Sequence, residues 1–405
     1  MTTVHITNAY HPTSGGIRTF YEALIEAGER RRRRVVVVVP GESDDHDRTG
    51  AFGSIYRVRA PRAPAFDRRY RLMLPHTYFP GVGSRIVGIL AREQPDLVEI
   101  CDKYSLPYLA AMLRKRWHPR VRRPALVGLS CERFDDNMAA YLSASTAART
   151  FTRWYIRHVY GPPFDAHIAI SQYTARELRD ALYDRAPGFI RTCPMGVDAD
   201  RFGPQNADSA LRLELLRRAG GRHDSVLLLY AGRISPEKNV ALLVDTLRAL
   251  TREGRGDHRL VIAGDGPLAG WLRRQATGPL EGRILLCGSI DRCELPRYVA
   301  SCDVFVHPNP REPFGICPLE AMASGVPVVL PSAGGVLEYA SDANAWVAAP
   351  TGEAFADAVA AARRGDPVRT AGAIATARCF QWREIADRYF ALYDEIGSAR
   401  REEVA

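Results

Sequence analysis

The sequence predicts an α/β protein built from two doubly wound, Rossmann-like parallel-sheet domains that face a central cleft. Short apolar runs alternate with helical patterns along most of the chain. These runs are apolar on both faces, as the buried strands of parallel sheets are. A length of 405 residues also exceeds what one compact core holds.

The first half alternates strands and helices at the spacing of βαβ units. Strands are expected at 4–7, 35–39, 97–100, 125–129 and 167–170, and helices at 17–30, 84–93, 106–116, 145–159 and 173–183. Residues 194–204 are rich in turn formers and lack periodicity, so we place a domain boundary there. The predicted domains cover 1–200 and 201–379.

The pattern restarts after this boundary. Strands are expected at 226–230, 259–263, 284–287, 304–306 and 326–330, and helices at 239–250, from 268 and after 315. A final amphipathic helix is expected within 380–400.

Composition excludes several classes of protein. The chain is 46% hydrophobic and 25% charged, which is typical of folded globular proteins. No apolar run approaches the roughly 18 residues of a membrane span, and the first residues do not resemble a secretory signal, so we expect a cytoplasmic protein. The eight cysteines form no C-x-x-C pair, which predicts reduced thiols and no metal site.

The net charge of +9 is concentrated in the first half. Residues 1–204 hold 31 Lys and Arg against 21 Asp and Glu, a balance of +10, whereas the rest hold 24 against 25. This asymmetry suggests an anionic partner, either nucleic acid, an acidic lipid surface or a phosphorylated substrate. An arginine-rich composition without function explains it equally well. Nucleic acid is disfavoured, because no recognised reading module is present.

Candidate ligand-binding residues follow predicted strands, where open parallel sheets bind ligands. Gly15 and Gly16 open a helix after the first strand, and bare amides there can approach an anion. Arg233 and Lys238 flank a strand-to-helix turn in the second half and suit a diphosphate. A pair of solvated surface cations is the alternative.

The third candidate segment carries two glutamates. Glu312 precedes a turn, and Glu320 lies two helical turns further along the following helix. Each carboxylate can accept hydrogen bonds from hydroxyls of a polyol, and the amides of Gly315 and Ile316 at the helix start face an anion. A helix-surface role for Glu320 is the alternative, although the surrounding sequence is apolar.

Together these motifs resemble the family-4 retaining glycosyltransferases of the GT-B architecture. The resemblance rests on EPFGICPLEAMASGVPVV at 312–329, GRISPEKN at 232–239 and GDGP at 264–267. It extends over nearly the whole chain through ISQYT at 170–174, MGVD at 195–198 and SAGGVLE at 332–338. In this architecture the last helix returns to complete the first, acceptor-side domain.

The resemblance implies that the second domain binds a nucleotide-diphosphate sugar. Arg233 and Lys238 would hold the diphosphate, Glu312 the donor sugar and Glu320 the ribose hydroxyls. Glu312, Arg233 and Lys238 would therefore be the catalytic residues. Because side chains supply the positive charge, neither a metal nor another cofactor is expected.

Further donor contacts are implied by the same resemblance. The amides around Phe314, Gly315 and Ile316 would support the sugar and the phosphate. Gly15 and Gly16 would meet the diphosphate from the first domain.

One position departs from the family pattern on the acceptor side. Alignment places Cys131 where members commonly have a histidine, and a thiol cannot donate and accept hydrogen bonds as imidazole does. Glu132, Arg133 or Asp135 would then take the positioning role. Weak activity, or an alignment shifted by one residue, are the alternatives.

The expected activity is transfer of a hexosyl group, with mannose favoured, from a GDP- or UDP-sugar to a hydroxyl acceptor that is a glycan or lipid-linked. A non-catalytic sugar-nucleotide-binding partner protein and a GT-B-like sugar-nucleotide epimerase are the alternatives.

Residues 57–79 mix arginines with apolar side chains and suggest peripheral contact with an anionic membrane on its inner face. Packing of these side chains in the core is the alternative. These apolar side chains are Tyr70, Leu72, Met73, Leu74, Tyr78 and Phe79.

Overall fold

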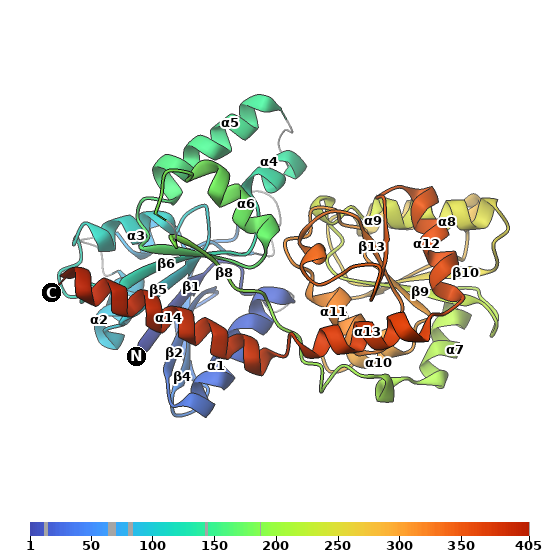
Figure 1. Ribbon diagram of the computed structural model, residues 1–405, viewed down its shortest axis with the longest axis horizontal. Helices are drawn as coiled ribbons and strands as arrows, with labels where there is room; N and C mark the ends of the chain where they lie inside the picture. Colours follow the sequence, from blue (N-terminus) through green and yellow to red (C-terminus); the bar gives the residue numbers. More distant parts are fainter. Residues whose placement is uncertain (12–14, 64–69, 80–83, 142–144, 187, 405) are drawn as a thin grey trace. The chain divides into compact units, whose positions relative to one another are not determined.

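The computed structural model describes residues 1–11, 15–63, 70–79, 84–141, 145–186 and 188–404. The chain forms two compact units, Met1–Met195 with Trp382–Ala405, and Gly196–Gln381 (Figure 1). These limits differ by a few residues from the divisions expected after 200 and 379. Each unit holds its own sheet and its own core.

The first unit contains an eight-stranded sheet in the order β3-β4-β2-β1-β5-β6-β7-β8. All neighbours pair in parallel except β3 and β4. The strands are β1 (Thr2–Thr7), β2 (Arg34–Gly41), β3 (Asp45–Arg48), β4 (Gly53–Arg59), β5 (Leu97–Cys101), β6 (Ala125–Ser130), β7 (Ala166–Ala169) and β8 (Ile190–Thr192). The helices are α1 (Gly16–Arg31), α2 (Arg85–Glu93), α3 (Pro107–Arg114), α4 (Phe134–Tyr141), α5 (Thr146–Tyr155), α6 (Gln172–Ala181) and α14 (Trp382–Val404).

The second unit contains a six-stranded, all-parallel sheet in the order β11-β10-β9-β12-β13-β14. Its strands are β9 (Val226–Ala231), β10 (His258–Ala263), β11 (Ile284–Gly288), β12 (Val304–Val306), β13 (Val328–Pro331) and β14 (Trp346–Ala348). Its helices are α7 (Ser209–Arg218), α8 (Ala241–Arg252), α9 (Ala269–Gln275), α10 (Leu295–Ala300), α11 (Ile316–Ala323), α12 (Gly352–Arg363) and α13 (Pro367–Arg378). The predicted fold class is confirmed.

Burial explains why the strands could be predicted. In β2 the five valines from Val35 to Val39 expose at most 2% of their surface. Helices cover both faces of such a strand, so no position needs to be polar.

The C-terminal helix α14 is bonded to the first sheet through Glu99 of β5, which is fully buried. Tyr393 of α14 and Tyr21 of α1 both donate hydroxyl hydrogen bonds to its carboxylate, the latter over 3.1 Å. His5 Nδ1 lies 3.0 Å from Glu99 Oε1. A buried carboxylate needs such partners, so this cluster ties the end of the chain to its beginning.

Residues 57–79 do not form the exposed apolar surface that the sequence suggested. Met73 and Tyr78 are fully buried, and the Tyr78 hydroxyl donates to the carbonyl oxygen of Ser105. Tyr70, Leu72 and Leu74 are half-buried, and Phe79 is exposed. The alternative, packing in the core, therefore holds for Met73 and Tyr78.

Two arginines of this stretch form ion pairs. Arg57 lies in β4 and pairs with Asp45 and Asp47 of the neighbouring β3. Arg71 pairs with Glu42. Residues 64–69, with their two arginines, lie outside the described residues.

Two further properties of the chain bear on its class. Across the described residues, no helix combines the length and the apolar character that crossing a membrane requires. All eight cysteines are free thiols.

The Glu99 cluster predicts a stability effect. Tyr393→Phe removes one donor from a buried carboxylate and should lower the free energy of unfolding by about 1–3 kcal/mol, measured by urea denaturation. Tyr183→Phe is the control, because Tyr183 is 75% exposed and its substitution should change nothing. Equal stability of the two variants would show that the Tyr393 hydroxyl contributes nothing.

Candidate active site

Two loops at one edge of the second sheet bring the predicted catalytic side chains together. Strands β9 and β12 are parallel neighbours, so the loops that follow them leave the sheet at the same edge. The loop after β9 carries Arg233 and Lys238, and the loop after β12 carries Glu312. Residues 74 positions apart in the sequence therefore become contacts.

The Lys238–Glu312 ion pair is the centre of this arrangement. Lys238 Nζ donates to both carboxylate oxygens of Glu312, over 2.8 and 3.1 Å. Asn309 Nδ2 donates to Glu312 Oε2 over 3.1 Å, and His307 Nε2 lies 3.3 Å from that oxygen. Burial opposes ionisation of Glu312, but Lys238 and His307 outweigh it and hold its pKa well below the ordinary value. Glu312 is thus a permanently charged carboxylate.

Arg233 lies nearby in the loop after β9 and is held by a side chain that the sequence did not single out. Its Nη2 lies 2.9 Å from Glu237 Oε1, and the Ser235 hydroxyl donates to the same oxygen over 2.6 Å. The Arg233 side chain keeps 36% of its surface exposed. Glu237 orients the guanidinium while leaving part of it accessible to an anion.

Close backbone packing sets the course of the loop after β9. A Cβ added at Gly264 would lie 1.9 Å from the carbonyl oxygen of Gly232, and one at Gly266 would lie 2.2 Å from that of Ile234. Ile234 N also donates to the Asp265 carbonyl over 3.0 Å. Only glycine permits this approach, which explains the GDGP motif.

Gly315 starts α11 with a backbone that favours glycine, since its φ is +87°. Tyr339 donates its hydroxyl hydrogen bond to the Gly315 carbonyl over 2.6 Å, and a Cβ at Gly315 would lie 3.0 Å from that hydroxyl. Phe314 is buried and packs its ring on Tyr339 and Phe380. Its side chain is therefore part of the core. Ile316 begins α11, whose first-turn amides lack partners within the helix.

Glu320 lies on α11 with 7% of its surface exposed, so it is not the helix-surface glutamate of the alternative reading. Burial raises its pKa to about 7, although Arg292 and a hydrogen bond with Cys317 oppose the shift. Two glutamates eight residues apart in the same motif therefore differ in charge state near neutral pH.

The first unit holds the remaining predicted residues. Gly15 and Gly16 lie at the start of α1, where a Cβ at Gly15 would meet nothing within 4 Å. Cys131, Glu132 and Arg133 follow β6 and precede α4. Both groups lie at carboxyl ends of strands, as the sequence predicted.

Arg133 is engaged by neighbours within the same segment. Its Nη2 lies 2.5 Å from Asp135 Oδ2, and its guanidinium lies 4.6 Å from the centre of the Tyr173 ring. Burial and a hydrogen bond with Cys101 raise the pKa of the Cys131 thiol well above its ordinary value, so it stays protonated.

A buried ion pair that the sequence reasoning missed holds the segment between β6 and α4. Lys103, 1% exposed, donates from Nζ to Glu177 Oε2 over 2.6 Å and to the Glu132 carbonyl over 2.5 Å. Glu177 Oε1 accepts from the backbone amide of Asp135 over 2.9 Å. The Lys103–Glu177 pair is therefore hydrogen-bonded to the backbone at both ends of residues 132–135.

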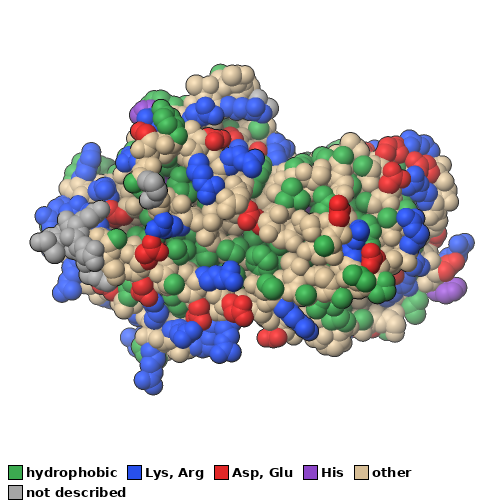
Figure 2. All heavy atoms as spheres, viewed as in Figure 1, with side chains coloured by type: hydrophobic (Ala, Val, Ile, Leu, Met, Phe, Trp, Pro, Cys, Tyr) green, Lys and Arg blue, Asp and Glu red, His purple; other side chains and the backbone are tan. Residues whose placement is uncertain are grey.

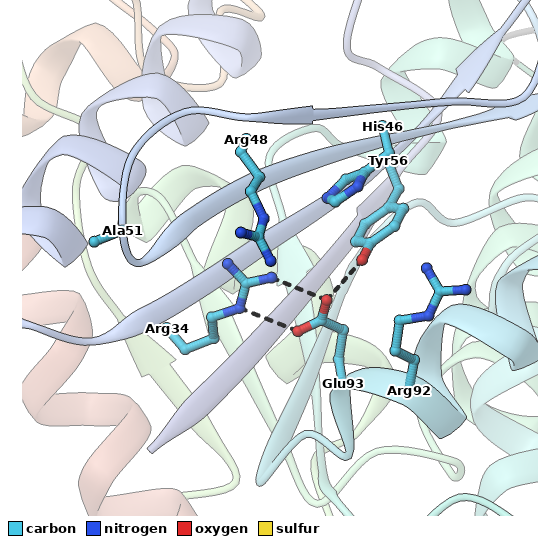
Figure 3. Close-up of a pocket in the computed structure, with 7 residues that line it drawn as sticks. All are labelled: Arg34, His46, Arg48, Ala51, Tyr56, Arg92 and Glu93. Carbon is cyan, nitrogen blue, oxygen red and sulfur yellow. Dashed lines mark hydrogen bonds and ion pairs between the residues drawn. The ribbon is translucent and has the colours of Figure 1, made fainter.

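A separate pocket of about 600 Å³ lies in the first unit and contains none of the predicted site residues. Figure 3 shows Glu93 accepting from Arg34, at the amino end of β2, and from the Tyr56 hydroxyl. The other lining residues are His46, Arg48, Ala51 and Arg92. Because the candidate site residues lie at carboxyl ends of strands, this pocket is not part of their arrangement.

Groups that could bind a metal are not gathered here. Within the part of the chain that the structure describes, no three His, Cys, Asp or Glu side chains form a potential metal site. The positive charge beside Glu312 comes from Lys238, and Arg233 lies in the same loop as this lysine.

Comparison with known proteins identifies the class to which this fold and site belong. Residues 14–201 match the family model described as Glycosyltransferase Family 4, and residues 225–363 match that of Glycosyl transferases group 1. The chain belongs to family 4 of the glycosyltransferases, with the GT-B architecture, as the motifs predicted.

Among its relatives are two mannosyltransferases. The chain is 30% identical to a GDP-mannose-dependent alpha-(1-6)-phosphatidylinositol dimannoside mannosyltransferase of Mycobacterium tuberculosis, covering 89% of this chain and 87% of that protein. It is 28% identical to a corresponding monomannoside mannosyltransferase of Mycolicibacterium smegmatis, covering 98% of each. The sucrose-phosphate synthase structure from Thermosynechococcus elongatus shares the fold, with a TM-score of 0.74 at 18% identity, over 98% of this chain and all of that one.

The raised pKa of Glu320 predicts a pH-dependent stability. The folded protein binds this proton more tightly than the unfolded chain, whose value is near 4.5. The resulting stabilisation is complete below pH 4.5 and is lost as the pH rises to about 7. Between pH 5 and 8, wild type should therefore lose on the order of 3 kcal/mol relative to Glu320→Gln, measured by urea denaturation.

The control for this experiment is Glu214→Gln, an exposed glutamate of α7. Its stability should follow wild type across the pH range. Parallel pH profiles for wild type and Glu320→Gln would contradict the raised pKa.

The Lys103–Glu177 pair predicts a local effect on the segment between β6 and α4. Lys103→Met alone leaves Glu177 buried without its partner and should cost about 3–5 kcal/mol of stability. The double variant Lys103→Met/Glu177→Leu removes both charges and should be nearly as stable as wild type. Amide hydrogen exchange over residues 131–137 should nevertheless be faster in the double variant, because both hydrogen bonds from the pair to this segment are lost. Unchanged exchange over residues 131–137 would show that the ion pair does not hold this segment.

Proposed function

We propose that the protein is a retaining, metal-independent mannosyltransferase that moves mannose from GDP-mannose to a hydroxyl of a lipid-linked acceptor. The observation that carries the proposal is the buried Lys238–Glu312 pair beside Arg233, at the ligand-binding edge of the second sheet. The relatives named for GDP-mannose and phosphatidylinositol mannosides support the donor and the acceptor class.

The diphosphate of the donor would lie against Arg233 and Lys238. When the bond between C1 of mannose and the phosphate oxygen breaks, negative charge develops on the leaving diphosphate. Cations held in place beforehand stabilise that charge most effectively. Lys238 is held by Glu312 and Arg233 by Glu237, so neither cation has to be ordered during the reaction.

Glu312 would accept hydrogen bonds from hydroxyls of the donor mannose. Its charge is maintained by Lys238, and a charged acceptor binds a hydroxyl more strongly than a neutral one. Glu320 would accept from the ribose hydroxyls. The amides of Phe314, Gly315 and Ile316 would support the sugar and the phosphate.

Retention of configuration follows if the acceptor hydroxyl attacks C1 from the face on which the diphosphate departs. The new bond joins the acceptor oxygen to C1, and the bond from C1 to the phosphate oxygen breaks. The acceptor proton passes to the leaving phosphate oxygen, and GDP is released. Gly15 and Gly16 would contact the diphosphate from the first unit, and Glu132 would help to orient the acceptor.

A lipid-linked acceptor would place the protein at the cytoplasmic face of a membrane as a peripheral protein. The balance of +10 over residues 1–204 favours an anionic lipid surface. A second candidate function, sugar-nucleotide binding without transfer, is favoured by one observation only, the presence of Cys131 where relatives commonly have histidine.

The test is turnover of GDP-mannose, with UDP-glucose in parallel. Glu312→Gln should keep the fold but lower kcat by about 100-fold or more, and Arg233→Ala should cost about 2–4 kcal/mol of transition-state stabilisation. Glu214→Gln, an exposed and ion-paired glutamate of the same unit, is the matched control and should retain full activity. A chelator should leave the rate unchanged.

Several outcomes would contradict the proposal. Near wild-type turnover of Glu312→Gln at saturating donor would remove its role at the sugar. A strict metal requirement would overturn the account based on Arg233 and Lys238. Preference for UDP-glucose would retain the class of reaction and correct the donor.

A further inference from the structure

Helix α5 presents two large aromatic side chains to solvent. Phe151 is 48% exposed and Trp154 is 52% exposed, with ring centres 6.2 Å apart in a stacked arrangement. Trp154 also stacks on the exposed His158 one turn later, at 5.4 Å. In a helix, positions 151, 154 and 158 lie on one face, so these rings form a continuous aromatic stripe.

The neighbouring face of α5 is buried and fixes this stripe in place, and the Tyr155 ring lies 6.2 Å from that of Phe151. Thr152 and Tyr155 are buried, and the Tyr155 hydroxyl donates to the Lys103 carbonyl over 2.9 Å. The Tyr155 ring lies 5.2 Å from that of Phe134. The exposed rings therefore stand on a helix anchored to the first unit; they are not side chains of a frayed end. In Figure 1, α5 lies at the outer edge of that unit.

The charge around the stripe is positive. From residue 137 to residue 164 the sequence contains three arginines, one histidine and no aspartate or glutamate. Arg149 and Arg153 are both exposed and lie four residues apart, so they share a second exposed face of the same helix. Arg157 pairs with Asp184 over 2.9 Å, an acidic neighbour from beyond α6. Figure 2 shows Lys and Arg side chains gathered over α4 and α5.

We propose that α5 is the surface that contacts an anionic bilayer, with Phe151 and Trp154 inserted at the headgroup level and Arg149 and Arg153 on lipid phosphates. Tryptophan favours the membrane–water interface, and arginines beside it gain from the negative surface potential. The inference rests on the proposed function, since a lipid-linked acceptor requires the enzyme to work at a bilayer. It replaces residues 57–79 as the contact surface, because Met73 and Tyr78 are buried there and Arg57 and Arg71 pair with acidic side chains.

The experiment uses the full chain with vesicles of phosphatidylcholine alone or with phosphatidylinositol, at low and high salt. Wild type should co-sediment with the phosphatidylinositol vesicles, and less so at high salt, because screening weakens the contribution of the arginines. Phe151→Ala/Trp154→Ala should lower the partition coefficient roughly tenfold at both salt concentrations. Arg149→Gln/Arg153→Gln should lower it at low salt and reduce the salt dependence.

Trp117→Ala is the matched control. Trp117 is also a tryptophan of the first unit and is 48% exposed, but it lies outside α5. Its variant should bind vesicles as wild type does. Because all these side chains are exposed, each variant should keep the thermal stability of wild type, which circular dichroism checks.

The proposal is overturned if wild type does not bind the anionic vesicles, or if Phe151→Ala/Trp154→Ala binds as well as wild type. A dimer in lipid-free solution that this variant abolishes would assign the stripe to a second copy of the chain. GDP-mannose hydrolysis without vesicles should be the same in the α5 variants and in wild type. Vesicle binding that depends on α5, without any GDP-mannose turnover, would refute the proposed function and leave the membrane surface standing.

Discussion

The candidate site of the second unit depends on one buried ion pair, Lys238 with Glu312. A carboxyl group this buried keeps its charge only beside a compensating partner, and removing either member of such a pair typically costs about 3–5 kcal/mol. The pair joins the loops that follow two neighbouring strands, β9 and β12. The first unit contains a similar buried ion pair, in which Lys103 and Glu177 hold the loop after β6 by hydrogen bonds. In a chain with 52 arginines and three lysines, two of the lysines form these pairs, where a compact ammonium rather than a broad guanidinium is bound.

The fold could be predicted because parallel strands covered on both faces are apolar throughout, and five consecutive valines leave little ambiguity. Short strands without such burial carry a weaker signal. Strand β8 has three residues, none of them buried, and was not predicted, whereas the equally short β12 is fully buried and was predicted. Strand β4 was not predicted, and its Arg57, taken as part of a basic stretch, pairs with the acidic side chains of β3. A charged residue on a strand next to a sheet edge finds its partner through pairing that the local sequence does not reveal.

The candidate site was predictable where its residues lie together in a motif, as Glu312, Gly315 and Glu320 do. The polar side chains that hold these residues were not. Asn309 and His307 stand in the same loop as Glu312, but the sequence does not tell which of its polar side chains turn inward. Glu177 meets Lys103 across 74 positions, and only the rarity of lysine in this chain could have drawn attention to Lys103. Supporting contacts arise from topology, which a motif does not encode.

Glu312 and Glu320 are the same type of residue, but their environments suit them to two different tasks. Both are buried, yet the pKa of Glu312 is held low by Lys238, whereas burial raises that of Glu320 to about 7. Groups whose environments drive their pKa values apart are suited to different roles. A carboxylate charged at every physiological pH suits a position beside a sugar at which positive charge develops. A carboxyl group that ionises near neutral pH costs less free energy to bury when no ligand is bound, because it can be protonated. Its charged form is then stabilised when the hydroxyls of a ligand donate hydrogen bonds to it. The second unit thus places Glu312, which stays charged, beside the proposed reacting centre, and Glu320, whose charge varies with its surroundings, further along α11.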